Sequence, residues 1–466
     1  MSCVSLTSVG DVGKKQLGQE ESVVPESVHE HLSRHVLADG YKLVVDLERS
    51  HGCWLVDARD GAEYLDCYSF FASLPLGFNH PDLTTEEFLH RLGQTAVHKP
   101  ANPDIYSVEL AEFADTFARV LGDPALPHLF FVEGGALAVE NAMKVAFDWK
   151  SRRNERAGIE VEGDMVLHLR HAFHGRSGYT LSVTNTDPVK VARFPKFDWP
   201  RMESPALRFP LAEFSEENRR SEDAAVVQAA EFFAANPNRI ACFLAEPLQA
   251  EGGDRHFSDR FLLAMQEMCL ENDALFVLDE VQTGAGVTGA RWAYEKMGLE
   301  PDVVAFAKKV QLGGVMGGRR VDEEPENVFN VSSRISSTWG GGLTDMMRST
   351  RILEVMERDD LVENAAKVGA VLRNQLVDLV AEYPEHLSNA RGMGLLCAVD
   401  FTSPDERGEV IRDMREKEHV IVLPCGERSI RFRPALVATA EEMSEATEAL
   451  HHVMKARKES GQKVAS

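Results

Sequence analysis

The sequence of 466 residues predicts an α/β protein with a mostly parallel, buried sheet, followed by a smaller α+β unit. Between about residues 105 and 345, near-continuous apolar runs alternate with stretches that have helical periodicity. These runs are residues 128–132, 165–169, 240–245, 274–278 and 303–306. Such runs are typical of strands that are buried on both faces of a sheet. The chain length also favours two or three domains.

Composition and charge exclude several classes of protein. The chain has 44% hydrophobic and 27% charged residues, as an ordinary globular enzyme does. Its formal net charge of -24 repels nucleic acid and anionic membranes, so neither is an expected partner. Neither a signal peptide nor an apolar run of the ~20 residues that span a membrane is recognisable, and we expect a cytoplasmic protein. The seven cysteines form no CxxC pair, so free thiols are expected.

The N-terminal part of the chain divides into two segments. Residues 1–26 are polar and without period, which predicts a mobile tail. Residues 27–80 are expected to form the N-terminal segment of a small domain. Alternation of apolar and polar residues at 42–47, 54–57 and 63–66 predicts short antiparallel strands within that segment.

Residues 81–345 are the expected large domain and residues 346–466 the expected C-terminal small domain. In the large domain, the strand at 128–132 precedes a helix predicted from Ala136 to about Lys150. In the small domain, helices are predicted at 346–358, 361–383 and 405–418 and from about residue 440, with strands at 394–401, 419–423 and 429–433.

Three of the predicted strands end in residues that can carry chemistry. In α/β folds, ligand-binding groups gather at the carboxyl ends of the strands. Asp279 follows the run at 274–278, Lys308 follows the run at 303–306, and Gly134-Gly135-Ala136 opens the helix after 128–132. Each has an ordinary structural explanation: a helix cap, a solvated lysine or a turn. Together they supply an amine for an aldehyde, a carboxylate for a pyridinium and an anion cup at a helix N-terminus.

Longer stretches carry a resemblance to a known family. They are residues 129–142, 172–181, 194–200, 245–257 and 278–284. The sequence resembles the class III, fold-type I aminotransferases, which depend on pyridoxal 5'-phosphate (PLP), and within that class it is most similar to the lysine 6-aminotransferases. The resemblance implies a large domain with a central, mostly parallel sheet of the seven-stranded type, and a small α+β domain built from both termini.

The resemblance also implies the catalytic residues. Lys308 aligns with the lysine that forms the Schiff base with PLP, whereas the adjacent Lys309 is expected to be solvated or structural. Lys308, once displaced by an incoming amine, would serve as the general base. Asp279 would pair with the pyridine nitrogen and keep the ring protonated.

Five further residues are implied to hold the cofactor. Gln282 would hydrogen-bond the 3-oxygen of the ring and border the substrate, and Phe173 would lie against one ring face. Gly135 and Ala136 would donate backbone N–H groups to the phosphate. Thr338 would reach the phosphate of the neighbouring subunit, so the resemblance implies a homodimer.

Three charged residues are implied to select the substrates. Arg176 would hold the distal carboxylate of each substrate, because a guanidinium offers a bidentate fork for carboxylate. Arg431 would bind the carboxylate beside the oxo group of 2-oxoglutarate. Glu251 matches a switch residue, which would pair with Arg431 when lysine is bound and swing away for the oxo acid. Leaving a buried charge unpaired costs several kcal/mol, so a movable partner is physically reasonable.

The implied reaction transfers the ε-amine of L-lysine to 2-oxoglutarate. Its products are glutamate and 2-aminoadipate 6-semialdehyde, which cyclises to piperideine-6-carboxylate. The lysine enzymes carry Asn where this chain has Ser336, Gly at Ala250 and Asn at Gly342, so ornithine, 4-aminobutyrate or another ω-amino acid stays open as the donor. A third alternative is a non-catalytic relative that only binds, against which the intact Lys308 and Asp279 argue.

Two other motifs have ordinary structural explanations. His31 and His35 stand one helical turn apart, but no third ligand lies nearby in the sequence, which favours a solvated helix face over a metal site. The glycine-rich stretch 313–318 is not followed by Gly-Lys-Ser/Thr and is not a P-loop. We therefore expect no metal.

Overall fold

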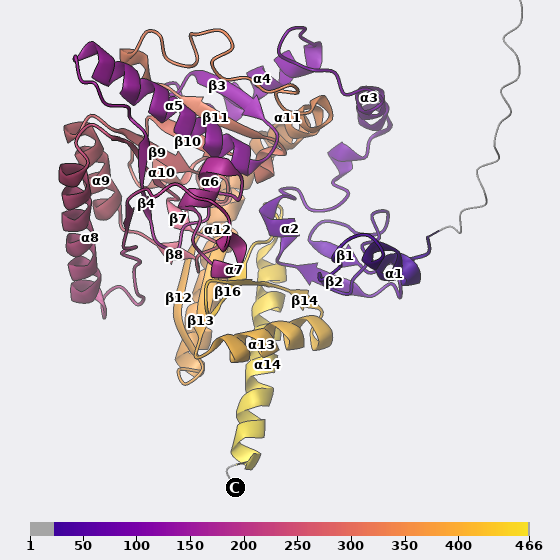
Figure 1. Ribbon diagram of the computed structural model, residues 1–466. Coiled ribbons are helices and arrows are strands. Elements are labelled where there is room, and N and C mark those ends of the chain that lie inside the picture. Colours follow the sequence, from indigo (N-terminus) through magenta and orange to yellow (C-terminus); the bar gives the residue numbers. More distant parts are fainter. Residues whose placement is uncertain (1–22, 465–466) are drawn as a thin grey trace, which may run out of the picture.

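The structure is a computed structural model that describes residues 23–464 (Figure 1). A central seven-stranded sheet forms the larger part of the molecule. Its strands, in spatial order, are β3 (His128–Val132), β11 (Gly313–Gly317), β10 (Val303–Phe306), β9 (Leu275–Asp279), β6 (Ile240–Ala245), β4 (Met165–Leu169) and β5 (Arg201–Met202). Only β11 runs antiparallel to its neighbours, so the predicted mostly parallel sheet is confirmed. Of the tail predicted for residues 1–26, residues 1–22 lie outside the described residues, and η1 (Pro25–Ser27) begins within the remainder.

The sequence did not predict two strands of this sheet, the two-residue edge strand β5 and the inner strand β11. Glycine is depleted in strands because it has no side chain to pack, so the glycine-rich stretch 313–318 gave no strand signal. In the sheet, a Cβ atom on Gly314 would lie 2.3 Å from Cζ of Phe306. The glycines of β11 therefore allow a close approach to neighbouring side chains.

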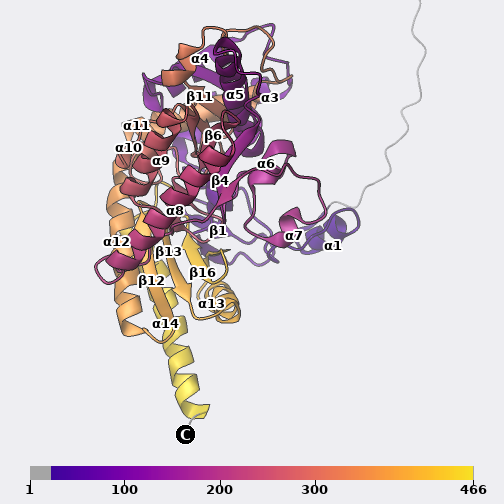
Figure 2. The same cartoon turned by 60° about the vertical axis from the view of Figure 1, so that its left-hand side comes forward.

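The two faces of the central sheet bury two different cores. Val303 and Ala305 of β10 pack into a core with α5 (Gly135–Arg156). Val304 and Phe306, the alternate residues, pack into the larger core on the other face. That core includes residues of α4 (Val108–Val120), α8 (Ser215–Ala235), α9 (Asp259–Glu271) and α11 (Leu343–Arg358). Figure 2 shows α8 and α9 side by side over the sheet.

Two smaller sheets lie outside the central sheet, and the three-stranded one joins the N-terminal and C-terminal parts of the chain. The three-stranded sheet has the order β1 (Trp54–Val56), β2 (Glu63–Asp66) and β14 (Val420–Ile421). The four-stranded sheet has the order β12 (Leu387–Met393), β13 (Leu396–Phe401), β16 (Ser429–Phe432) and β15 (Leu423–Cys425). Helices α12 (Leu361–Glu382), α13 (Pro404–Lys417) and α14 (Ala440–Val464) accompany them. The expected domain boundaries at residues 80 and 345 stay predictions.

Three predictions for these sheets differ from the structure. Residues 42–47 form no strand, although Val45 forms an isolated antiparallel bridge with Asp57, directly after β1, and Asp46 donates a backbone hydrogen bond of 2.9 Å to Val56. The single strand predicted at 419–423 is two strands in two sheets, because β14 pairs with β2 whereas β15 pairs with β16. Strand β12 was not predicted, because its polar sequence lacks an apolar alternation.

The remaining elements are short, except for α3, and connect the larger ones. They are η1 (Pro25–Ser27), α1 (Val28–Ser33), α2 (Ser69–Ala72), η2 (Pro81–Leu83), α3 (Glu86–Ala96), α6 (Gly178–Val183), α7 (Pro188–Val191), β7 (Leu248–Gln249), β8 (Arg255–His256), α10 (Ala293–Lys296), η3 (Lys308–Val310) and η4 (Arg319–Glu323).

The described residues also bear on the expectations for metal sites, membrane spans and cysteines. No group of three or more His, Cys, Asp or Glu residues in the described chain is arranged to hold a metal ion. Between residues 23 and 464, no helix has both the length and the apolar character of a membrane span. The cysteines of this part of the chain are free thiols, and all are buried. Cys3 lies outside the described residues.

Two adjacent leucines on α9 test how the sheet is covered. Leu262 is fully buried in the larger core, whereas Leu263 is 41% exposed. We expect Leu262→Ala to cost about 2–5 kcal/mol, because it removes buried methyl groups and leaves a cavity. Leu263→Ala is the matched control and is expected to stay within about 1 kcal/mol. Thermal unfolding of both variants measures the difference, and equal losses would mean that α9 does not present this face to the sheet.

Candidate active site

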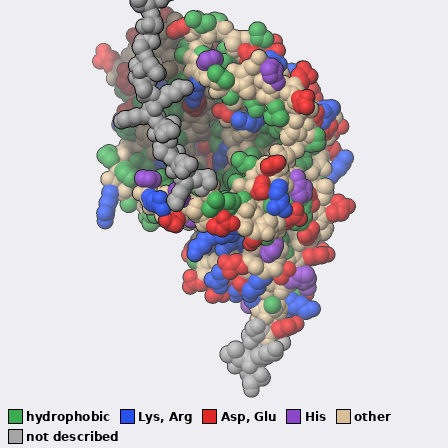
Figure 3. Space-filling model, turned by 90° about the vertical axis from the view of Figure 1, so that its right-hand side faces the viewer, with side chains coloured by type: hydrophobic (Ala, Val, Ile, Leu, Met, Phe, Trp, Pro, Cys, Tyr) green, Lys and Arg blue, Asp and Glu red, His purple; other side chains and the backbone are tan. Residues whose placement is uncertain are grey.

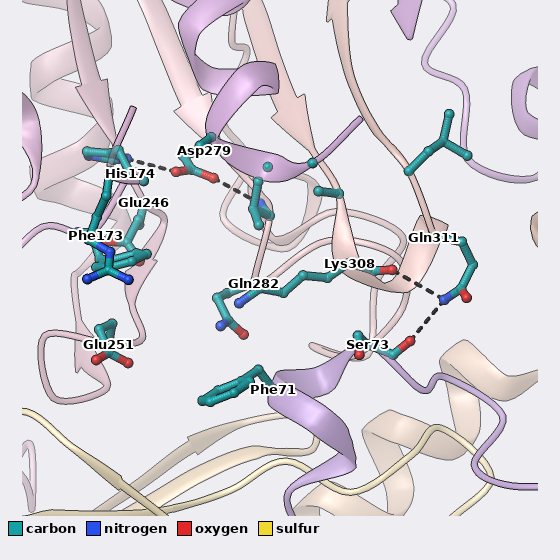
Figure 4. A pocket seen from close by; sticks show the side chains of 18 of the residues that line it. Phe71, Ser73, Phe173, His174, Glu246, Glu251, Asp279, Gln282, Lys308 and Gln311 are labelled. Carbon is teal, nitrogen blue, oxygen red and sulfur yellow. Dashed lines mark hydrogen bonds and ion pairs between the residues drawn. The ribbon is translucent and has the colours of Figure 1, made fainter. Parts of the chain in front are cut away.

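A cavity of about 860 Å³ lies at the carboxyl ends of the central strands (Figure 4). Its lining comes from the ends of β9 and β10, the start of α5, the loop after β6, and α2. The predicted residues that line it are Gly135, Ala136, Phe173, Arg176, Glu251, Asp279, Gln282, Lys308 and Arg431. The sheet thus brings together side chains that are up to about 300 positions apart in the sequence.

Lys308 begins η3 directly after β10 and has a left-handed backbone, with φ of 51°. Figure 4 shows its side chain extending into the middle of the cavity. Burial, with a contribution from the Arg431 guanidinium, lowers the pKa of the Lys308 amine to about 8. A larger fraction of this amine is therefore neutral near pH 7 than in an ordinary lysine.

Lys309 points away from solvent. It is 2% exposed, and its Nζ donates a hydrogen bond of 2.7 Å to the backbone oxygen of Gln282. Burial, and then the charge of Lys308, lower the pKa of Lys309 well below its ordinary value. Of the two expectations for this residue, the structural one is confirmed and the solvated one is wrong.

Asp279 is the last residue of β9 and is 4% exposed. Its Oδ2 lies 2.8 Å from Nδ1 of His174, and its Oδ1 accepts a hydrogen bond of 3.0 Å from the backbone N–H of Val281. His174 is buried and fixes the orientation of the carboxylate. The sequence analysis missed His174, although it stands beside Phe173 in a stretch that matched the family.

Glu246 is a second buried carboxyl group that the sequence analysis missed. It follows β6, and it accepts hydrogen bonds from the backbone N–H groups of Phe173, at 3.0 Å, and Ala250, at 3.2 Å. Burial, and then the charge of Asp279, raise the pKa of Glu246 well above its ordinary value. Glu246 thus joins the loop that carries Phe173 to the loop that carries Glu251.

The N-terminus of α5 opens into the cavity. Gly134 is its N-cap, with φ of 87°, and no side chain of the described residues caps the helix there. Gly135 and Ala136 therefore present backbone N–H groups at the positive end of a 22-residue helix, where anions bind. A Cβ atom on Gly135 would lie 3.0 Å from the Val281 side chain, so the glycine permits this close packing.

Glu251 is shared between two cations. Its Oε2 lies 3.0 Å from Nη2 of Arg431, and its Oε1 lies 2.5 Å from Nζ of Lys190 on α7. Burial alone would raise the pKa of the Glu251 carboxyl, but Arg431 and Lys190 outweigh it, so its pKa lies below the ordinary value. The pairing of Glu251 with Arg431 matches the sequence expectation. Lys190 was not predicted, because nothing in its local sequence distinguishes it from a surface lysine.

Buried arginines hold the loop that carries Glu251. Arg433 stands two residues after Arg431. It pairs with Asp254, and both side chains are buried. Arg391 donates a hydrogen bond of 2.6 Å to the backbone oxygen of Gly253. The backbone oxygen of Glu251 also accepts a hydrogen bond of 2.9 Å from Gly426. The backbone of this loop is therefore fixed from several directions.

Helix α2 is a left-handed turn that brings Phe71 to the cavity. Its four residues have φ between 40° and 63°, although none is glycine. Asp66 accepts hydrogen bonds of 2.8 Å from the backbone N–H groups of Tyr68 and Ser69, and Gln311 donates one of 2.9 Å to the oxygen of Ser73. Non-glycine residues keep such a backbone only where the surroundings impose it, and such positions gather at functional sites.

Two of the predicted substrate and cofactor residues lie apart from these contacts. Arg176 lines the cavity with an exposed side chain that forms no ion pair with any described residue. Thr338 is exposed and does not line the cavity. Its predicted contact involves a second subunit, and its role stays a prediction. Of the positions that depart from the lysine enzymes, Ala250 is fully buried and Ser336 is exposed.

Comparisons with known proteins show similarity over most of the chain. The family model for class-III aminotransferases matches residues 36–454. An L-lysine-epsilon aminotransferase from Streptomyces clavuligerus is 57% identical over 91% of this chain and 93% of its own. The solved structure of a lysine aminotransferase from M. tuberculosis has a TM-score of 0.91, with 53% identity over 93% of this chain and 100% of that one. The mitochondrial 4-aminobutyrate aminotransferase of Mus musculus is 32% identical over 86% of this chain and 82% of its own.

The matched range contains the central sheet, the cavity and both smaller sheets, so family membership covers the site as well as the fold. This chain belongs to the class III aminotransferases.

Proposed function

We propose that this protein transfers the ε-amine of L-lysine to 2-oxoglutarate, with PLP as its cofactor. The observation that carries the proposal is the meeting, in one cavity, of Lys308 and Asp279 with the pair of Glu251 and Arg431. Relatives named L-lysine-epsilon aminotransferase are 54–57% identical to this chain, whereas relatives named 4-aminobutyrate aminotransferase are 32–35% identical. This difference supports lysine as the donor.

The groups in the cavity fit PLP. Lys308 offers an amine for the aldehyde, and the buried Asp279 offers a carboxylate for the ring nitrogen. The uncapped N-terminus of α5 offers N–H groups for the phosphate. Oε1 of Gln282 is buried and has no hydrogen-bond partner among the described residues, which fits a contact with a ligand group. Phe173 lines the same cavity and offers a ring face.

The residues of the cavity have separate roles in the proposed reaction. When bound, PLP supplies an aldehyde that takes up amino groups and a ring that accepts electrons. Lys308, whose pKa is lowered to about 8, removes a proton from the substrate carbon that bears the amine. Asp279, oriented by His174, would face the ring nitrogen with its side-chain oxygens.

Three charged residues select the two substrates. Arg176 receives the distal carboxylate, since its exposed guanidinium forms no ion pair with residues 23–464. With lysine bound, Glu251 neutralises the buried Arg431, whose charge would otherwise be unpaired. With 2-oxoglutarate bound, the carboxylate beside the oxo group takes the place of Glu251 on Arg431. A single cavity can thus accept an amine-ended and a carboxylate-ended substrate in turn.

A homodimer is part of the same proposal, with Thr338 reaching the phosphate of the neighbouring subunit. Exposed apolar side chains support a partner surface: Leu89, Val97, Ile105, Tyr106 and Val108 are 49–81% exposed. Figure 3 shows a face of the molecule that is hollowed, with hydrophobic side chains around the hollow. Exposed apolar clusters of this kind mark association surfaces.

Removal of the Lys308 amine tests the catalytic assignment. We expect the visible absorbance band of the PLP-loaded protein to be lost in Lys308→Ala, and kcat to fall by about 10²–10⁴-fold, because covalent attachment and the general base are lost together. Lys144→Ala, on the exposed side of α5, is the matched control and should keep both. Colourless wild-type protein that cannot take up added PLP would contradict the proposal.

The lowered pKa of Lys308 predicts a pH dependence. In enzyme freed of PLP, only the neutral amine reacts with trace acetic anhydride. Labelling of Lys308 should rise with pH and level off above about pH 8, because the neutral form then dominates. Mass spectrometry of the digest, with Lys144 as internal reference, measures this. Labelling of Lys308 that still rises steeply between pH 9 and 10 would show an unperturbed amine.

A panel of donors tests the substrate. With 2-oxoglutarate as acceptor, we expect kcat/KM for lysine to exceed that for ornithine by about 10–200-fold, the discrimination that one methylene group provides. 4-Aminobutyrate, which lacks the α-amine, should also be slower. Glutamate formation measures turnover, and piperideine-6-carboxylate identifies the product. Equal or faster turnover of ornithine or 4-aminobutyrate would overturn lysine as the donor.

A further inference from the structure

Lys190 is a charged residue of the cavity to which neither the family resemblance nor the proposed reaction gives a role. It lies on α7, in the connection between α6 and β5. The backbone of α7 is fixed by Asp187, whose side chain accepts a hydrogen bond of 2.9 Å from the N–H of Val189. Nζ of Lys190 lies 2.5 Å from Oε1 of Glu251 and 5.5 Å from the ring centre of Phe173.

The two cations that share Glu251 differ in depth. The side chain of Arg431 is 2% exposed, whereas those of Glu251 and Lys190 are 28% and 27% exposed. Glu251 therefore lies between a buried guanidinium and a lysine that is nearer to solvent. Each of its two oxygens faces one of them.

The proposed function requires Glu251 to leave Arg431 when the oxo acid binds. Three cations act on the Glu251 carboxylate: Arg431, Lys190 and Lys308. In the half-reaction with 2-oxoglutarate, Arg431 binds the substrate carboxylate and Lys308 takes part in proton transfer. Lys190 is then the cation that is left for Glu251, and its four-carbon stem can follow a moving carboxylate.

We propose that Lys190 is a positioning residue that retains Glu251 as an ion pair after Glu251 has released Arg431. The inference rests on the proposed function, because it assigns a partner to the released state of Glu251. Loss of Lys190 costs more in that state, since the carboxylate then has no cation, than in the present state, where Arg431 still neutralises it. A ligand equilibrium that depends on release of Glu251 shifts accordingly.

The test compares four variants of the PLP-loaded enzyme. Lys190→Met removes the charge and Lys190→Arg keeps it, whereas Lys144→Met is the matched control on an exposed lysine outside the cavity. Glu251→Gln supplies the background for a double-mutant cycle. The probes are glutarate, a dicarboxylate without an oxo group, whose dissociation constant is measured by calorimetry, and 2-oxoglutarate, whose KM is measured separately from that of the amino donor.

We expect Lys190→Met to weaken glutarate binding and raise the KM for 2-oxoglutarate by about 10-fold, a typical coupling, with a much smaller change in kcat/KM for the donor. Lys190→Arg should restore both within about threefold, and Lys144→Met should match the wild type. In the Glu251→Gln background, Lys190→Met should cause no further loss, because Lys190 acts through Glu251.

Two results would overturn the proposal. An equal loss in both half-reactions would mean that Lys190 only supports Phe173 and the fold of the cavity. A loss that persists in the Glu251→Gln background would mean that Lys190 contacts the substrate directly. Glutarate binding does not depend on the amino donor. If the wild-type enzyme binds glutarate but does not turn over lysine, the assignment of lysine as donor is wrong, and the role of Lys190 can still be tested.

Discussion

The parallel pairing of β9 with β10 is the constraint on which the site depends. Its register places Ala305 beside Asp279, so that Lys308, three residues further on, emerges at the same sheet edge as the carboxylate. The adjacent β11 and β3 bring the N-terminus of α5 to this edge as well. A shift of one strand by a single residue would turn its side chains to the opposite face and separate the amine from the carboxylate. The buried cores on both faces prevent such a shift, because each would then receive the wrong residues.

The cavity also concentrates charges that burial would otherwise neutralise. Lys308 and Arg431 meet the carboxyl groups of Asp279 and Glu246 at the cavity wall, and Lys309 is buried directly behind Lys308. Burial lowers the pKa of both lysines and raises that of Glu246, so each group is shifted toward its neutral form. The arrangement of opposite charges decides which groups stay ionised. This explains why adjacent lysines can differ in role: the first faces the cavity, whereas the second is fixed to a backbone oxygen.

Much of this arrangement could be predicted from the sequence. Five strands of the central sheet follow from apolar runs, and the residues at their ends follow from the rule that ligands gather there. What could not be predicted depends on tertiary contacts. The glycines of β11 are needed because other parts of the chain lie against them: the Gly134 backbone against Gly313, Phe306 against Gly314 and Phe329 against Gly317. The left-handed turn at Phe71 is held by the side chains of Asp66 and Gln311. Lys190 was missed for the same reason.

The loop after β6 separates what is rigid in this site from what can move. Its backbone is fixed by Arg391, by the buried pair of Arg433 with Asp254, and by the hydrogen bond from Gly426. The side chain of Glu251, in contrast, is only partly buried and has alternative cations on its two oxygens. A change of partner therefore needs rotation of one side chain and no movement of the loop. Arg391 and Arg431 belong to the same small sheet, and Arg433 directly follows its strand β16, so the fold sets the distance between the Glu251 loop and Arg431. Under the proposed function, the substrate then decides whether Glu251 pairs with Arg431 or with Lys190.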